Sequence, residues 1–318
     1  ARAPRTEAPR PRPSPPRRTM HRILVLRGGA LGDFIVSLPA LAALRSRWPD
    51  ARLELPGNAT AAQLALNRGL VNAVHSQHES RWAALFSAGL LPPGFKAWLA
   101  GFDLVLNYWP DTDGELARHF PVKAGQVFIS AAAHPTRGPA SAHYAGPLRA
   151  FGIELSQKQL WFPLNSEDGR VAPNAPSLGP VRIAIHPGSG SPRKNWPLAR
   201  WVELCRWLRE AHAAELLIVT GEVETSATRE ALGAFGRELH SLPLEELIVE
   251  LARCRFFVGH DSGIAHLAAA CGVPSLLLFG PTDPAIWAPP AAHVRVLRKG
   301  ATLAEISVGD VQAALSPL

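Results

Sequence analysis

Cysteines and long apolar runs are scarce in this sequence. Its 318 residues include only three cysteines, Cys205, Cys254 and Cys271, which are scattered along the chain. An odd, unpatterned set of cysteines indicates reduced thiols in a cytoplasmic compartment and argues against a disulfide framework or a zinc site. The apolar run at 273–279 is far shorter than the roughly 20 residues that span a bilayer. We therefore expect a cytoplasmic protein without a transmembrane helix.

Charged residues are also sparse, at 19% of the chain, and they are unevenly placed. Residues 1–19 hold six arginines, six prolines and one glutamate, so most of the net charge of +7 lies there. Such a segment cannot bury enough apolar surface to offset the entropy of ordering, so we expect a disordered basic tail. We interpret it as an upstream extension of a chain whose natural start is Met20. Because the excess charge is concentrated in this tail, the sequence argues against binding of nucleic acid.

Short apolar runs alternate with helical patterns in two series. We expect strands at 23–26, 52–55, 72–74, 104–106 and 126–129, and again at 181–185, 216–220, 256–258 and 275–279. We expect helices at 33–44, 61–66, 81–90, 198–210, 225–232, 244–253, 263–271 and 301–315. Strands that alternate with helices imply parallel sheets with right-handed crossovers. The sequence therefore predicts an α/β fold with two Rossmann-like domains facing a central cleft.

The two series are separated by a stretch rich in proline, serine, asparagine and glycine, which is typical of a linker. We predict a first domain at 20–165, a linker at 166–179 and a second domain at 180–300. The last segment, 301–318, is expected to form a helix that packs back on the first domain.

The segment from Val258 to Asp283 carries the strongest functional pattern. A strand runs into Gly259, and Asp261, Ser262 and Gly263 follow at the expected start of a helix. Free N–H groups and the helix dipole make such a start an anion site. A plain helix cap by Asp261 or Ser262 is the alternative interpretation, and for this motif alone the two are equally supported.

A second pattern lies between a strand and a helix, at 186–197. Its glycine- and serine-rich turn includes Ser189 and is followed by Arg193 and Lys194. Such a turn with adjacent cations at the end of a strand suits a diphosphate, and Lys194 can neutralise charge on a leaving group. A solvated basic loop is the alternative interpretation. The P-loop pattern is absent from this turn.

Two carboxylates follow expected strands. Glu222 comes after the strand at 216–220, where an acidic side chain can accept hydrogen bonds from ribose hydroxyls or can simply be an exposed turn residue. Asp33 follows the turn Gly28-Gly-Ala-Leu-Gly32, whose spacing differs from the dinucleotide fingerprint. Asp33 is expected either to cap a helix or to act as a general base facing the cleft.

Taken together, these segments resemble glycosyltransferase family 9, the heptosyltransferases of lipopolysaccharide core synthesis. Asp261-Ser-Gly-Ile-Ala-His266 with Phe279-Gly-Pro-Thr-Asp283 is similar to the family's D-[ST]-G-x-x-H…F-G-x-T-[DS] signature. Lys194-Asn-Trp-Pro197 is similar to its K-x-W-P motif, and the segment 31–40 to its G-D-x-x-x-x-x-P-A motif. The resemblance implies a GT-B fold and an inverting transfer of a sugar, heptose from ADP-heptose, to a lipopolysaccharide-core or related glycan acceptor.

The resemblance also implies roles for single residues. It makes Asp33 the catalytic base, and it gives Lys194, Ser262 and Gly263 to the diphosphate. It gives Glu222 to the ribose, and Asp261 and His266 to the sugar and phosphate end of the donor; we add Ser189 of the neighbouring turn. No metal and no cofactor are expected, because the nucleotide sugar is a substrate. The acceptor is expected to be lipid-linked or an oligosaccharide, and the enzyme to be a monomer with peripheral contact at the inner membrane.

Two other interpretations remain open at this point. A GT-B-type nucleotide-sugar epimerase would act on the donor without an acceptor. A non-catalytic nucleotide-binding module would bind ADP or the donor and never release nucleotide. The presence of both Asp33 and Lys194 favours an enzyme over the module. The aromatic residues Trp82, Phe86, Trp98 and Trp109 are expected mainly in the core, with lipid or sugar contact as the alternative.

Overall fold

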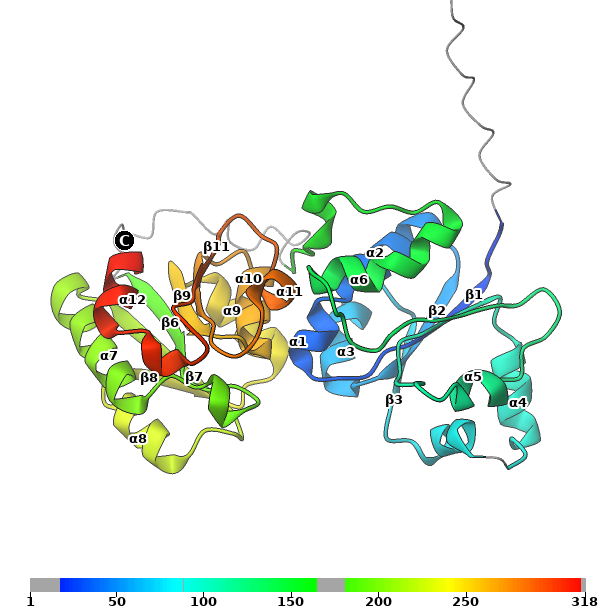
Figure 1. Cartoon of the computed structure of the whole chain (residues 1–318), viewed down its shortest axis with the longest axis horizontal. Coiled ribbons are helices and arrows are strands. Elements are labelled where there is room, and N and C mark those ends of the chain that lie inside the picture. Colours follow the sequence, from blue (N-terminus) through cyan, green and yellow to red (C-terminus); the bar gives the residue numbers. More distant parts are fainter. Residues whose placement is uncertain (1–17, 88, 165–180, 316–318) are drawn as a thin grey trace, which may run out of the picture.

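The computed structural model describes residues 18–87, 89–164 and 181–315. The expected linker at 166–179 and most of the basic tail lie outside the described residues. The described chain forms two parallel sheets, each flanked by helices, and Figure 1 shows the two halves side by side with α1 between them. The α/β fold with two Rossmann-like halves is therefore confirmed.

The first sheet has five parallel strands in the order β3-β2-β1-β4-β5. The strands are β1 (Arg22–Leu26), β2 (Arg52–Gly57), β3 (Ala73–Ser76), β4 (Leu104–Asn107) and β5 (Val127–Ser130). The helices are α1 (Leu31–Ile35), α2 (Leu38–Arg47), α3 (Ala59–Leu66), α4 (Pro93–Ala100), α5 (Glu115–His119) and α6 (Ala140–Ala145), with 3-10 turns at Ser80–Phe86, Gly146–Phe151 and Gln157–Leu160.

The second sheet has six parallel strands in the order β11-β10-β9-β6-β7-β8. The strands are β6 (Arg182–His186), β7 (Glu215–Thr220), β8 (Gly236–His240), β9 (Phe256–His260), β10 (Ser275–Leu278) and β11 (Val294–Leu297). The helices are α7 (Leu198–His212), α8 (Ser226–Gly233), α9 (Leu244–Ala252), α10 (Gly263–Ala270), α11 (Pro284–Trp287) and α12 (Val308–Leu315), with 3-10 turns at Pro192–Lys194 and Leu303–Glu305.

The central strands are apolar because both of their faces are covered. β1 and β9 are almost completely buried along their length, as parallel strands packed between two helical layers must be. Edge strands are less constrained, and β8 (Gly-Arg-Glu-Leu-His) and β11 (Val-Arg-Val-Leu) carry charged residues. For this reason neither β8 nor β11 was predicted from the sequence.

Three of the predicted helices differ from the structure. The helix expected at 33–44 is two helices, α1 and α2, because Pro39 in the first turn of α2 has no N–H to continue the ladder of hydrogen bonds from α1. The helix expected at 81–90 is a 3-10 helix that ends at Phe86. The helix expected at 301–315 is the short turn Leu303–Glu305 followed by α12.

The position predicted for the C-terminal helix is wrong. α12 packs against α7 within the second half rather than on the first domain. Val311 and Leu315 of α12 are fully buried in the same apolar cluster as Trp201 and Leu204 of α7. The apolar face of α12 is therefore satisfied by its own sheet layer, and it has no surface left to offer the first domain.

The two halves meet through helices rather than through the sheets. α1 packs against α10, and α3 packs against α9. Across the second of these contacts, Arg68 of α3 donates to both carboxylate oxygens of Glu245 on α9, at 2.9 and 3.2 Å. This arrangement fixes the ends of β1 and of β9 near each other. No helix in the described ranges is long and apolar enough to cross a membrane.

Candidate functional site

Four of the predicted site residues follow strands at the two places where strand order reverses. In the first sheet β1 and β4 are neighbours, and in the second sheet β6 and β9 are neighbours. Parallel sheets bind ligands in the crevice outside the carboxyl ends of such strands. Asp33 follows β1, Ser189 and Lys194 follow β6, and Asp261 follows β9. The topology therefore brings these four residues to the crevices of the two sheets.

The first turns of α1 and α10 touch through two glycines. A Cβ atom at Gly263 would lie 3.1 Å from the nitrogen of Gly32 and 2.9 Å from the Cβ of Leu31. A Cβ at Gly32 would in turn lie 3.1 Å from Cδ2 of His266. No side chain fits between the helices, so the residue after Gly32, Asp33, is held beside the start of α10. Figure 1 shows α1 meeting the second half at this position.

Asp33 is the third residue of α1, and its carboxylate stays accessible. The Oδ2 atom accepts a hydrogen bond from the backbone nitrogen of Ala30 at 3.1 Å, while a quarter of the side chain is exposed. The guanidinium of Arg27 lies behind it, with Nη2 3.9 Å from Oδ1. One oxygen of Asp33 thus closes the helix start, which confirms the cap interpretation, and the general-base role stays a prediction.

Lys194 joins the turn after β6 to the turn after β9. Its Nζ donates to the backbone oxygen of Asp261 at 3.1 Å and lies 3.2 Å from Oδ2 of the same residue. The lysine side chain is about a quarter exposed. An ammonium group has three N–H donors, so one remains for an anion in the crevice.

The two serines already have partners within their own turns. Ser262 is the N-cap of α10, and its hydroxyl accepts a hydrogen bond from the nitrogen of Ala265 at 3.2 Å. The cap interpretation therefore holds for Ser262. It is compatible with an anion site, because the first N–H groups of a helix have no carbonyl partner within it. The hydroxyl of Ser189 donates within its loop, with the oxygen of Ser191 at 2.8 Å and Oδ1 of Asn195 at 2.7 Å, so it shapes this turn.

His266 lies on α10 beneath the contact with α1. Burial lowers its pKa, against the opposing influence of the carboxylates of Asp261 and Asp33. A neutral imidazole next to Gly32 and Asp33 can accept or donate a hydrogen bond without adding a charge to the crevice.

His260 connects the end of β9 to the turn after β6, and no sequence motif pointed to it. Its Nε2 accepts a hydrogen bond from the backbone nitrogen of Trp196 at 2.9 Å, and its Nδ1 lies 3.4 Å from the oxygen of Gly188. Burial lowers the pKa of His260 to about 3, so the ring is neutral and can accept this bond. Its position directly before Asp261, at the end of a buried strand, was the available signal.

Replacement of His260 by asparagine is expected to make the protein less sensitive to acid. The unfolded chain protonates this histidine as pH falls through about 6.5, and the folded chain does so only near 3. The unfolded state therefore binds more protons in this window, and the wild type should lose about 2 kcal/mol through His260 between pH 7 and 5. Urea unfolding at both pH values measures this loss. Equal losses in the wild type and the variant would contradict the prediction.

The carboxylate predicted for the ribose, Glu222, points into solvent, and its neighbour Glu224 is the buried one. Glu222 is exposed in the turn after β7, whereas the side chain of Glu224 is only 2% exposed. Glu224 Oε2 accepts from the nitrogen of Gly221 at 2.6 Å, and Oε1 is buried 3.9 Å from Nδ1 of His186 without a hydrogen bond. Glu224 also packs against Gly188, where a side chain would collide with it. Sequence spacing alone could not separate two glutamates two positions apart.

The aromatic residues of the first half belong mainly to its core, as expected. Trp82 and Trp109 are buried and meet edge to face, with ring centroids 5.4 Å apart. Trp98 is half-buried, and Phe86 is 43% exposed and stacks on Trp109. Phe86 is therefore the member of this group that is accessible to a partner.

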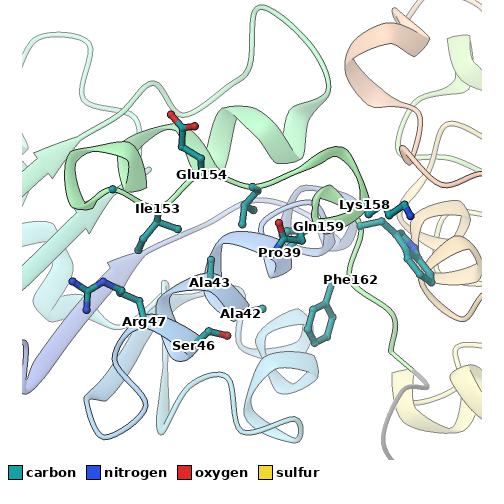
Figure 2. A pocket seen from close by; sticks show the side chains of 13 residues that line it. Pro39, Ala42, Ala43, Ser46, Arg47, Ile153, Glu154, Lys158, Gln159 and Phe162 are labelled. Carbon is teal, nitrogen blue, oxygen red and sulfur yellow. The ribbon is translucent and has the colours of Figure 1, made fainter. Parts of the chain in front are cut away.

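A cavity of about 520 Å³ lies between α2 and the segment at 152–162 (Figure 2). Arg47, Lys158 and Phe162 are among the residues that line it, and none of the predicted site residues does. Its walls come from the first half and from the residues that lead to the second. Within residues 18–87, 89–164 and 181–315, no group of three or more His, Cys, Asp or Glu side chains could hold a metal ion.

The sequence and the fold of the chain are similar to those of known proteins. A family model described as glycosyltransferase family 9 (heptosyltransferase) matches residues 142–312. The chain is 26% identical to lipopolysaccharide heptosyltransferase 2 of Salmonella typhimurium, with 91% of each chain covered. It is 27% identical to lipopolysaccharide heptosyltransferase 1 of Pseudomonas aeruginosa, with 83% of this chain and 79% of that protein covered.

Two solved structures share the fold over most of their length. A family 9 glycosyltransferase from Veillonella parvula matches with a TM-score of 0.70 and 20% identity, over 92% of this chain and 96% of that one. The ADP-heptose lipopolysaccharide heptosyltransferase II of E. coli matches with a TM-score of 0.70 and 21% identity, over 92% and 97%. The predicted GT-B fold is therefore confirmed.

Proposed function

This chain belongs to glycosyltransferase family 9, and we propose that it transfers heptose from ADP-heptose to a sugar of a lipopolysaccharide core. One observation carries the proposal. The glycine contact between α1 and α10 keeps Asp33 close to His266 in the first turn of α10, and Lys194 bonds to Asp261 just before that turn begins. The relatives support the choice of sugar and acceptor, because they are lipopolysaccharide heptosyltransferases. Two E. coli heptosyltransferase structures of the same fold hold ADP and an ADP-2-deoxy-2-fluoro heptose.

We propose an inverting reaction with a single displacement at the anomeric carbon. The acceptor hydroxyl gives its proton to the free oxygen of Asp33 as the new glycosidic bond forms on one face of the sugar. The bond to the diphosphate breaks on the opposite face, and ADP leaves with the electron pair. One half of the protein thus supplies the base, and the other half binds the leaving group.

Negative charge that develops on the diphosphate needs fixed positive partners. We infer that the remaining N–H of Lys194 and the backbone N–H of Gly263 donate to it, supported by the dipole of α10. We propose that these donors take the part that a divalent cation plays in other transferases. His260 and Asp261 fix the geometry, since they tie the two turns together before substrate binds.

We assign the ribose contact to Glu224. Its buried Oε1 has no hydrogen-bond donor among the residues that the structure describes, and ribose hydroxyls would supply donors at the carboxyl end of β7. Replacement of Glu224 by glutamine is expected to raise the KM for the donor about 10-fold, the loss typical of one hydrogen bond to a charged group. Steady-state kinetics with varied donor measures this, with Glu222→Gln as the matched control, expected within about 2-fold of wild type. A larger effect at Glu222 would return the ribose to the residue predicted from sequence.

A donor screen tests the activity itself. The purified protein is incubated with ADP-heptose, UDP-glucose and GDP-mannose, with and without lipopolysaccharide core precursors, and released nucleotide and products are measured. The proposal expects release from ADP-heptose that depends on the acceptor. An altered donor formed without any acceptor would indicate an epimerase, and binding without release would indicate a nucleotide-binding module. Vesicle co-sedimentation in the same assay tests the proposed peripheral contact with the inner membrane.

A further inference from the structure

Arg27 is a buried cation directly behind the proposed base. It follows β1 and is only 3% exposed, and it is one of few charged side chains buried to this degree in the described ranges. We propose that Arg27 is a positioning residue, which ties together the two ends of the turn that carries Asp33 and so fixes the position of its carboxylate without pairing with it directly. This inference rests on the proposed role of Asp33 as the base.

The guanidinium of Arg27 spans the turn that presents Asp33. Its Nη1 donates to the backbone oxygen of Gly28 at 2.8 Å, and its Nη2 donates to the backbone oxygen of Asp33. The two bonds connect the beginning of the turn to its end at the third residue of α1. A planar, forked donor set is what such a two-point contact requires, and lysine cannot supply it.

The guanidinium of Arg27 and the carboxylate of Asp33 lie close to each other but are not hydrogen-bonded. Arg27 Nη2 lies 3.9 Å from Asp33 Oδ1, which is too long for a hydrogen bond. Oδ1 accepts no hydrogen bond from the described residues, because the bond from Ala30 goes to Oδ2. Arg27 therefore holds the backbone of the turn, while the carboxylate oxygen that would receive the acceptor proton stays free.

Burial of this cation is unfavourable, which argues for a role beyond packing. Its Nε is buried without a hydrogen-bond partner, and burial lowers the pKa of Arg27. The ring of Tyr144, 4.2 Å from the guanidinium carbon, offsets part of this cost, and Tyr108 holds that tyrosine in place through a 2.6 Å bond to its backbone oxygen.

Few other charges face Asp33. Tyr144 approaches from α6 and His266 from α10, and burial lowers the pKa of His266 so that it is neutral. Lys194 and Asp261 pair with each other across the crevice. Arg27 is thus the cation of the first half that lies beside the turn of Asp33.

The chain offers a matched control at the other end of the same strand. Arg22 begins β1, approaches the carboxylate of Glu54 at 3.0 Å and lies 4.4 Å over the ring of Phe102. Each of the two arginines therefore lies at one end of β1, near a carboxylate and over an aromatic ring of its own. Arg22, however, is remote from the crevice. Arg22→Met reports what loss of such an arginine does to folding alone.

The first experiment compares Arg27→Met, Arg27→Lys and Arg22→Met by kcat and by the KM for the donor. Arg27→Met is expected to lose about 30-fold in kcat with donor KM within about 3-fold, because the carboxylate is displaced while the donor site stays intact. Arg27→Lys keeps the charge but not the forked pair of hydrogen bonds, so its kcat is expected to lie between those of Arg27→Met and the wild type. Arg22→Met leaves both readouts unchanged.

A second readout does not depend on turnover. The carboxyl carbon and backbone amide of Asp33 are followed by NMR of protein labelled at aspartate, with Asp33→Asn to identify the signals. Both signals are expected to move in Arg27→Met, because the turn loses the contacts that join its two ends, and to stay in place in Arg22→Met. Unmoved Asp33 signals in folded Arg27→Met would overturn the proposal, even if the donor screen finds no transfer. If Arg27→Met does not fold, full kcat in Arg27→Lys would overturn it as well.

Discussion

Asp33→Asn is expected to lower kcat by on the order of 100-fold or more, while donor affinity stays within a few-fold of wild type. Asparagine keeps the hydrogen bond that Oδ2 accepts from Ala30, so α1 can still begin at the same residue. It cannot take a proton from the acceptor hydroxyl, so the transfer loses its base. Single-turnover kinetics and donor calorimetry separate the two quantities.

The matched control for Asp33→Asn is Asp111→Asn. Asp111 also places its carboxylate at the start of a helix, where it accepts from the backbone nitrogens of Leu116 and Ala117. Any general cost of removing such a carboxylate appears in both variants. Near-normal turnover in Asp33→Asn would remove Asp33 from the role of base, and an equal loss in Asp111→Asn would show that folding is responsible.

Lys194→Ala is expected to weaken both donor binding and kcat, together by about 100-fold in kcat/KM. The change removes the charged donor proposed for the diphosphate, and such a contact strengthens as the leaving group gains charge. It also removes the link to Asp261 that joins the turns after β6 and β9. Initial rates at varied donor concentration measure the effect.

Arg193 supplies the control for this second change. It is the preceding residue in the same turn, carries the same charge and is exposed. If only the local density of positive charge matters, Arg193→Ala and Lys194→Ala should lose similar amounts. The proposal expects Arg193→Ala to stay within about 3-fold of wild type. Unchanged kcat and KM in Lys194→Ala would refute its contact with the diphosphate.

The fold could be predicted from sequence where burial dictates the pattern. The central strands β1, β6 and β9 are covered on both faces, so their apolar runs are unambiguous. At the sheet edges this constraint is absent, and β8 and β11 were missed. α12 was placed on the wrong half, because an apolar helix face predicts burial without naming its partner.

The candidate site, like the fold, could be predicted from the sequence only in part. Positions tied to the turn after a buried strand, such as Asp33, Lys194 and Asp261, could be named from sequence because the topology brings strand ends together. Residues whose role depends on side-chain direction could not. Glu224 turns inward where Glu222 turns outward, and Arg27 folds back under a turn that lies after it in the chain.

The contact between Gly32 and Gly263 allows the choice of substrate to change in evolution while the spacing between Asp33 and α10 stays constant. The close approach at these two positions sets how far Asp33 stands from the start of α10, because a Cβ atom at Gly263 would lie 2.9 Å from the Cβ of Leu31 and one at Gly32 would lie 3.1 Å from Cδ2 of His266. Exchanges of side chains elsewhere around the crevice can then change what binds there while this distance stays the same. A scaffold of this kind can diversify its substrates while its chemistry stays fixed.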